Sequence, residues 1–131
     1  MASILFDPYL VFLIFITTVL GVVIGVLPGL GATTGAALLL PFTLTMQPVH
    51  AIAVLATIYV SATFAGSITA ILINTPGTSA AAATTFDGYP LAQRGEAGRA
   101  LGIAVVSSTI GGVFSVIVLC IAAPMLARVA Y

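Results

Sequence analysis

Long uncharged apolar stretches, separated by short segments rich in proline, glycine and polar residues, set the hydrophobic pattern of this chain. The stretches cover residues 9–27, 32–46, 49–73 and 100–127. At about 1.5 Å of helix per residue, the first stretch spans about 28 Å, which is close to the thickness of a hydrocarbon core. The pattern predicts an all-α fold of polytopic integral membrane helices, in a single membrane domain over residues 1–131.

The second apolar stretch, residues 32–46, is short for a full crossing, because it reaches only about 22 Å as a helix. Pro41 lies inside it and adds a kink or an end. The stretch is therefore either a half-helix or one arm of a re-entrant hairpin. Residues 49–73 and 100–127 are each long enough to cross with some tilt.

Two segments break the apolar pattern, Pro28-Gly29-Leu30-Gly31 and Asn74-Thr75-Pro76-Gly77-Thr78. Proline cannot donate a backbone hydrogen bond, and glycine loosens a helix. Irregular backbone at membrane depth is tolerated only where protein or a water-filled cavity satisfies its polar groups. Two broken helices in one membrane chain indicate the binding site of a transporter. The candidate substrate- or ion-binding residues are Pro28, Gly29, Gly31, Thr33, Asn74, Thr75, Pro76, Gly77 and Thr78.

The first break leaves two interpretations open. Its glycines resemble a phosphate loop, but the chain contains no lysine, which excludes a Walker-type site. Thr33 and Thr34 either coordinate a cation or a substrate oxygen, or they bond the carbonyl groups of their own helix.

The second break offers two kinds of ligand group. A helix that restarts after Gly77 would direct free amides and the positive end of its dipole at an anion. The carbonyl groups left at the end of the preceding helix would suit a cation such as sodium. The alternative is a Pro-Gly turn outside the membrane.

Four local patterns refine the helices. Asp7-Pro8 predicts a helix start, because aspartate caps free amides and proline suits the first turn. Gly21 and Gly25, four residues apart, predict close helix packing. His50 is expected at an interface. A cluster of small hydroxyl residues serves either tight packing or a polar lining: Ser61, Thr63, Ser67 and Thr69.

Composition and charge narrow the function. The chain is 61% hydrophobic and 5% charged, far below the charge of soluble domains, so it is expected to lie in a lipid bilayer. Its net charge is zero and it has no basic patch, which argues against a nucleic-acid partner. One cysteine and one histidine make no metal site, and no catalytic cluster of acids and bases is present. We therefore expect no catalytic residues, no cofactor and no enzyme activity.

The hydrophilic residues gather in one loop before the last apolar stretch. Phe86-Asp87-Gly88-Tyr89-Pro90 predicts a turn, in which Asp87 acts as a cap. Arg94 and Arg99 follow, and they make this loop the best candidate for the cytoplasmic side. Arg128 argues for the opposite orientation, so the topology is left open.

Three motifs in a fixed order resemble the TctA family, the large membrane subunit of the tripartite tricarboxylate transporters. They are Gly25-Val26-Leu27-Pro28-Gly29-Leu30-Gly31, then Asn74-Thr75-Pro76-Gly77-Thr78, then Asp87-Gly88-Tyr89-Pro90 with Arg94-Gly95-Glu96-Ala97-Gly98-Arg99-Ala100-Leu101. The similarity runs from about Phe6 to Arg128. It implies ion-driven import of small carboxylates such as citrate, with sodium or a proton as the coupling ion. It also implies a multi-pass location in a bacterial inner membrane, a small membrane subunit and a periplasmic solute-binding protein as partners.

Family members are several times longer than this chain and have two related halves. The resemblance therefore implies that the chain corresponds to the N-terminal portion of a permease, which supplies one side of a site between repeats. A second chain would then supply the missing half if this one is a split subunit. The alternative hypothesis is a small structural or assembly module of membrane helices with no substrate of its own.

Overall fold

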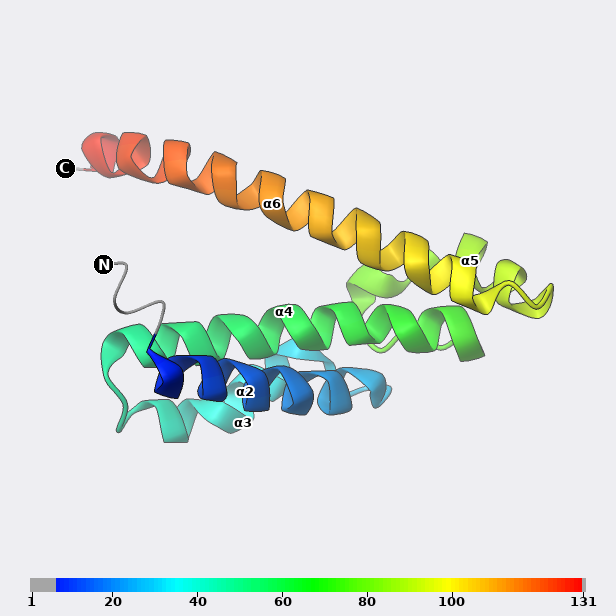
Figure 1. Cartoon of the computed structure of the whole chain (residues 1–131), viewed down its shortest axis with the longest axis horizontal. Helices are drawn as coiled ribbons and strands as arrows, with labels where there is room; N and C mark the ends of the chain where they lie inside the picture. Colours follow the sequence, from blue (N-terminus) through cyan, green and yellow to red (C-terminus); the bar gives the residue numbers. More distant parts are fainter. Residues whose placement is uncertain (1–6, 131) are drawn as a thin grey trace.

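The computed structural model describes residues 7–130, and within them it contains helices and no strand. Figure 1 shows their arrangement. The elements in chain order are α2 (Pro8–Val26), α3 (Gly31–Thr43), α4 (Pro48–Ile73), the 3₁₀ helix η1 (Ser79–Ala81), α5 (Thr84–Gln93) and α6 (Ala97–Ala130). The all-α prediction is confirmed.

Three of these helices are long and apolar enough to cross a membrane, namely α2, α4 and the segment Ala97–Arg128 of α6. Helix α3 has 13 residues and is too short for a crossing. It runs back alongside α4 toward the end at which α2 begins, so the short second stretch is one arm of a hairpin (Figure 1). The structure thus has the polytopic pattern with a broken segment that the sequence predicts.

The starts of α2 and α4 lie together. Asp7 caps α2, because its Oδ1 accepts the backbone N–H of Tyr9 at 3.1 Å, and Pro8 occupies the first turn. His50, in the first turn of α4, places Nε2 at 3.8 Å from Asp7 Oδ2, and its ring meets the Tyr9 ring edge-on at 5.6 Å. These contacts fix α2 and α4 in a parallel arrangement.

Glycines bring α2 and α4 into close contact, as the sequence predicts. A Cβ atom at Gly21 would meet the Ser61 side chain, and one at Gly25 would meet the backbone of Ala62. Only glycine lets the two backbones approach this closely. Helix α4 is the centre of the fold, and its most buried side chains include Ile58, with none of its surface exposed.

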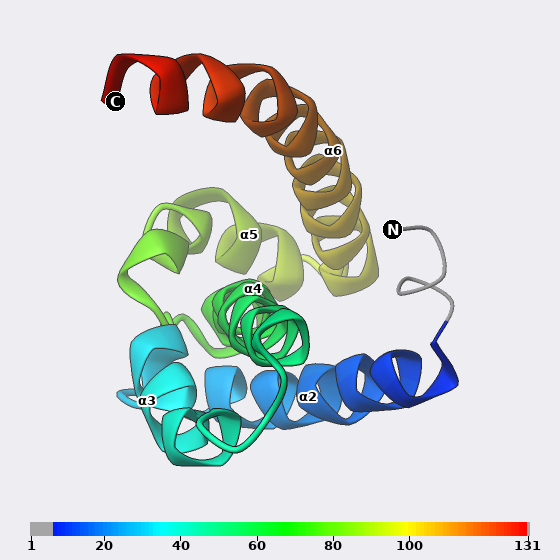
Figure 2. The same ribbon diagram turned by 90° about the vertical axis from the view of Figure 1, so that its left-hand side faces the viewer.

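Helix α6 differs from the others because it packs only through its first turns. Of its described side chains only that of Ala100 is buried, while large apolar side chains such as Phe114 and Ile117 are exposed. Figures 1 and 2 show the C-terminal part of α6 leaving the other helices. An exposed apolar surface of this length is stable when it contacts lipid chains or other membrane helices, but not when it contacts water.

The predicted turn at residues 86–90 is wrong, because these residues lie inside α5. Asp87 sits in the first turn of that helix, where a negative charge interacts favourably with the helix dipole. Gly88 is buried against Ile71 of α4, so the absence of a side chain at Gly88 lets α5 pack closely onto α4. Packing of α5 onto α4 overrides the local preference of Gly88 and Pro90 for a turn.

Candidate functional site

The first break separates α2 from α3 by a tight backbone reversal. Gly29 and Gly31 have φ angles of +92° and +59°, which side-chain-bearing residues rarely adopt. Leu30 N–H donates to the Leu27 carbonyl at 3.3 Å, which closes the turn. Helix α3 then begins at Gly31 without a side-chain cap, so the amides of its first turn are free.

The second break begins where Asn74 ends α4 in a left-handed conformation, with φ 55° and ψ 25°. Its backbone N–H bonds the Thr69 carbonyl, and that of Thr75 does so at 3.4 Å. The chain then folds back along α4, where Gly77 N–H donates to the Gly66 carbonyl at 3.3 Å. Gly66 lies about two turns before the end of α4, so this loop does not leave the helix bundle.

Three glycines join the two breaks. A Cβ atom at Gly77 would meet the Gly25 carbonyl oxygen and would lie 2.9 Å from Gly66 Cα. Gly66 in turn meets Thr78, whose backbone nitrogen would be 2.9 Å from an added Cβ. The second break is therefore packed between the end of α2 and the C-terminal part of α4, beside the first break.

Residues 29–34 and 77–80, at the two breaks, line one open pocket of about 260 Å³. A third wall comes from α4, through Tyr59 and Thr63. The pocket is smaller than the sites that hold drug-sized molecules, and it has room for a small organic ion. Its lining residues are Gly29, Leu30, Gly31, Ala32, Thr33, Thr34, Tyr59, Thr63, Gly77, Thr78, Ser79 and Ala80.

Uncommitted polar groups line this pocket. Thr78 Oγ1 is fully buried and has no hydrogen-bond partner among the described residues. A hydroxyl in that state is costly unless a ligand or water completes it. Thr63 is different, because its Oγ1 donates to the Tyr59 carbonyl at 2.7 Å. No charged side chain lines the pocket, so hydroxyl and amide groups are what it offers to an ion.

Five of the nine predicted site residues line the pocket, namely Gly29, Gly31, Thr33, Gly77 and Thr78. The other four predicted residues do not line it: Pro28, Asn74, Thr75 and Pro76. These four shape the backbone at the two breaks. Asn74 supplies the left-handed residue, and Thr75 Oγ1 donates to the Ile73 carbonyl at 3.3 Å.

From the sequence, Thr63 and Ser67 on α4 were left open between packing and lining, and Tyr59 was not selected. Tyr59, Thr63 and Ser67 recur every four residues, which places them on one face of a helix, and all three line pockets. Ser61 and Thr69 lie on another face, where they are buried and bond carbonyl groups of their own helix. The hydroxyl cluster thus serves both packing and lining: Thr63 and Ser67 share the pocket-lining face with Tyr59, whereas Ser61 and Thr69 are buried.

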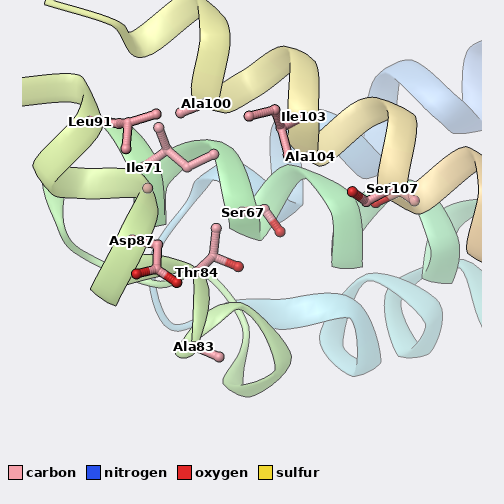
Figure 3. A pocket seen from close by; sticks show the side chains of 12 residues that line it. Ser67, Ile71, Ala83, Thr84, Asp87, Leu91, Ala100, Ile103, Ala104 and Ser107 are labelled. Atoms are coloured by element: carbon pink, nitrogen blue, oxygen red, sulfur yellow. The ribbon is translucent and has the colours of Figure 1, made fainter.

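A larger pocket of about 470 Å³ lies between α4, α5 and α6 (Figure 3). Apolar side chains such as Ile71 and Ile103 form most of its wall. Its polar groups come from three helices: Ser67 on α4, Thr84 and Asp87 on α5, and Ser107 and Ser108 on α6. Asp87 therefore lies in a helix beside α4 and α6 and not in a turn, although its side chain is exposed.

Nothing in the described residues forms a metal centre, since no three potential ligands among histidine, cysteine, aspartate and glutamate come together. His50 lies at the starts of α2 and α4, away from both breaks. Cys120 is exposed on α6. The break pocket and the pocket beside Asp87 each bring together polar groups from several helices.

Comparison with known proteins agrees with the motifs. A family model described as "Tripartite tricarboxylate transporter TctA family" matches residues 11–131. The chain is also 48% identical, over 116 residues, to the "Uncharacterized 52.8 kDa protein in TAR-I ttuC' 3'region" of Agrobacterium vitis. That alignment covers 88% of this chain and 23% of the relative, so the chain spans about a quarter of the relative's length. No solved structure matches the chain.

Proposed function

The chain belongs to the tripartite tricarboxylate transporter TctA family, and on that premise we propose that it forms part of a secondary transporter permease that imports small carboxylates. Uptake is driven by an ion gradient. A periplasmic solute-binding protein delivers the substrate, and a small membrane subunit completes the complex in a bacterial inner membrane. The chain itself performs no catalysis.

The observation that carries the proposal is the meeting of the two breaks in one pocket. Gly29 to Thr34 and Gly77 to Ala80, which lie far apart in the sequence, line the same space. Broken helices that converge in this way are the usual construction of a transporter site. The buried hydroxyl of Thr78, which has no partner among the described residues, favours a ligand site over a module built for packing alone.

The carboxylate binds through neutral donors. The free amides at the start of α3 and the positive end of its dipole favour a negative charge at this position. Thr33 and Thr78 add hydroxyl donors from the two breaks. Pro28, Asn74, Thr75 and Pro76 hold the backbone in place without touching the substrate. In a longer permease, the remaining protein or a second chain covers the open side of the pocket.

Uptake by the full-length permease with its partner subunits, reconstituted in proteoliposomes, tests the proposal. Radiolabelled citrate and other di- and tricarboxylates serve as substrates. Thr78→Val and Thr33→Val keep the side-chain shape but remove the hydroxyl donors, and we expect at least tenfold slower uptake from each. Thr109→Val is the matched control, because the Thr109 hydroxyl donates to the Val105 carbonyl on exposed α6. Wild-type uptake by both pocket variants would contradict the proposal.

A further inference from the structure

The second break is attached to α4 at two carbonyl groups. The backbone N–H groups of Asn74 and Thr75 both donate to the Thr69 carbonyl. Further along the break, Gly77 N–H donates to the Gly66 carbonyl at 3.3 Å. Gly66 and Thr69 are both buried, and hydrogen bonds in such surroundings are stronger than in water. The position of the break therefore depends on these two residues of α4.

The Thr69 side chain connects the two carbonyl groups. Its Oγ1 donates to the Gly66 carbonyl at 3.1 Å, and this is the same carbonyl that accepts Gly77 N–H. A Cβ atom at Gly77 would lie 3.3 Å from Thr69 Oγ1, so the hydroxyl is in close contact with the returning loop. Thr69 thus holds the start of the break through its own carbonyl, and its hydroxyl fixes the carbonyl that holds Gly77.

Contact between Gly66 and Thr78 carries this anchoring to the break pocket, which residues 29–34 and 77–80 line. A Cβ atom at Gly66 would lie 2.9 Å from both the backbone nitrogen and Oγ1 of Thr78, so Thr78 rests directly on Gly66. Thr78 contributes to the pocket the buried hydroxyl that has no partner among the described residues. Thr69 does not line the pocket. An effect of Thr69 on a bound ligand must therefore pass through Gly66 and the loop.

We propose that Thr69 is a positioning residue of the carboxylate site. Its hydroxyl fixes the Gly66 carbonyl, which holds Gly77 and thereby sets the place from which Thr78 offers its hydroxyl to the substrate. The inference rests on the proposed function, because it assigns Thr69 a role in that same pocket. A donor that is already held in place costs the substrate less ordering on binding, so loss of the Thr69 hydroxyl should weaken binding.

Thr43 has the same bond without a loop attached to it. Its Oγ1 donates to the Leu40 carbonyl at 2.8 Å, also three residues back, and Thr43 is 6% exposed, as is Thr69. No loop N–H among the described residues donates to that carbonyl, and Thr43 does not line the break pocket. Bonds of this kind are common in helices and indicate no role by themselves. Thr43→Val is therefore the matched control for Thr69→Val.

The transport test measures the carboxylate concentration that gives half-maximal uptake by the full-length permease with its partner subunits. Thr69→Val should raise this concentration about fivefold, the usual effect of one lost hydrogen bond, with little change in the maximal rate per folded protein. Thr69→Ser keeps the hydroxyl and should stay close to wild type, as should Thr43→Val. A purely structural loss would instead lower the maximal rate at an unchanged half-saturating concentration. Thr69→Ala removes the same hydroxyl and replaces Thr69→Val in the test if that variant does not fold.

A double variant tests whether Thr69 acts through Thr78. If the Thr69 hydroxyl serves to place the Thr78 hydroxyl, its removal has no further effect once the Thr78 hydroxyl is gone. Thr69→Val combined with Thr78→Val should therefore have the half-saturating concentration of Thr78→Val alone. Residues that act independently would multiply their two effects, and that result would contradict the proposed role.

Hydrogen exchange in the purified permease separates this inference from the transport proposal. Peptides that cover residues 75–80 should exchange faster in Thr69→Val than in wild type or in Thr43→Val, because Gly77 N–H loses a fixed acceptor. Faster exchange in a permease that carries no carboxylate would support the anchoring by Thr69 and reject the proposed substrate.

Three results would overturn the role of Thr69. The first is a wild-type half-saturating concentration in Thr69→Val or Thr69→Ala. The second is an equal rise in Thr69→Ser, which would assign the effect to the methyl group and not to the hydroxyl. The third is unchanged exchange of residues 75–80 in the variants that lack the hydroxyl.

Discussion

The two helix breaks both depend on glycine, but for different physical reasons. In the first break, Gly29 and Gly31 have positive φ angles, and an added Cβ atom at either would meet nothing within 4 Å. In the second break, Gly77 has no such φ angle, yet an added Cβ would meet Gly25 and Gly66. The first break needs glycine because of its backbone conformation, and the second needs glycine because there is no room for a side chain.

Glycine is thus required by the local backbone conformation at the first break and by contacts between distant elements at the second. The positive φ angles at the first break follow from the reversal between α2 and α3 and involve no other element. The crowding at Gly77 arises because one loop is held between α2 and α4, which are fixed by their own contacts. Disturbing Gly77 should therefore affect three elements together, whereas disturbing Gly29 should affect one turn.

The largest effect is expected from Gly77→Ala. The added methyl group would meet the Gly25 carbonyl and Gly66 Cα, both backbone atoms that no side-chain rotation can move aside. Overpacking of this kind costs about 1–3 kcal/mol, and more where the backbone resists. We expect a lower midpoint of thermal unfolding for the full-length permease in detergent, together with loss of carboxylate uptake.

Gly98→Ala is the matched control for this prediction. Gly98 lies in α6, where an added Cβ would meet nothing within 4 Å. Alanine in place of an exposed helical glycine stabilises by about 0.5–1 kcal/mol. A Gly77→Ala midpoint as high as that of Gly98→Ala would show that the second break is not confined as described.

A smaller effect is expected from Gly29→Ala. Open space surrounds this position, so the cost comes from the φ angle of +92° alone and amounts to about 1–2 kcal/mol. Gly29→Asn should cost less than Gly29→Ala, because asparagine tolerates positive φ angles better. Thermal unfolding of the two variants checks this order. Equal loss in both would point to steric crowding and would remove the distinction between the breaks.

The positions of the two breaks were predictable from the sequence, because proline and glycine inside apolar stretches have direct consequences for helix hydrogen bonds. The cap at Asp7-Pro8 and the close approach at Gly21 and Gly25 were predictable for the same reason. Each of these features depends on a few adjacent residues or on a fixed helical period. The long apolar stretches likewise predicted the three long helices.

Features set by distant contacts were not predictable. The turn assigned to residues 86–90 is a helix, because α5 packs its glycine against Ile71 of α4. The sequence does not predict that residues 75–77 fold back along α4. Gly77 bonds Gly66 there, and no local sequence pattern relates these two glycines. The third wall of the break pocket, formed by Tyr59 and Thr63, depends on this return of the chain. The sequence therefore predicted where the helices break, but not that both breaks share a pocket with this part of α4.

The smallest effect is expected at Asn74, which combines features of both breaks. It has a positive φ angle of 55°, like Gly29, but it belongs to the second break and is exposed. Asn74→Gly keeps the left-handed conformation accessible, so its thermal midpoint should stay close to wild type. Asn74→Ala should lose about 1 kcal/mol, because alanine resists this conformation.

Uptake by the same two variants decides what the Asn74 side chain does. Its amide does not line the break pocket, so we expect Asn74→Gly to transport carboxylate at the wild-type rate. Asn74→Ala should transport in proportion to the protein that remains folded. If Asn74→Gly folds normally but loses uptake, the amide itself contacts the substrate or the ion. The second break would then contribute a side-chain ligand as well as backbone, which would make the two breaks chemically as well as sterically distinct.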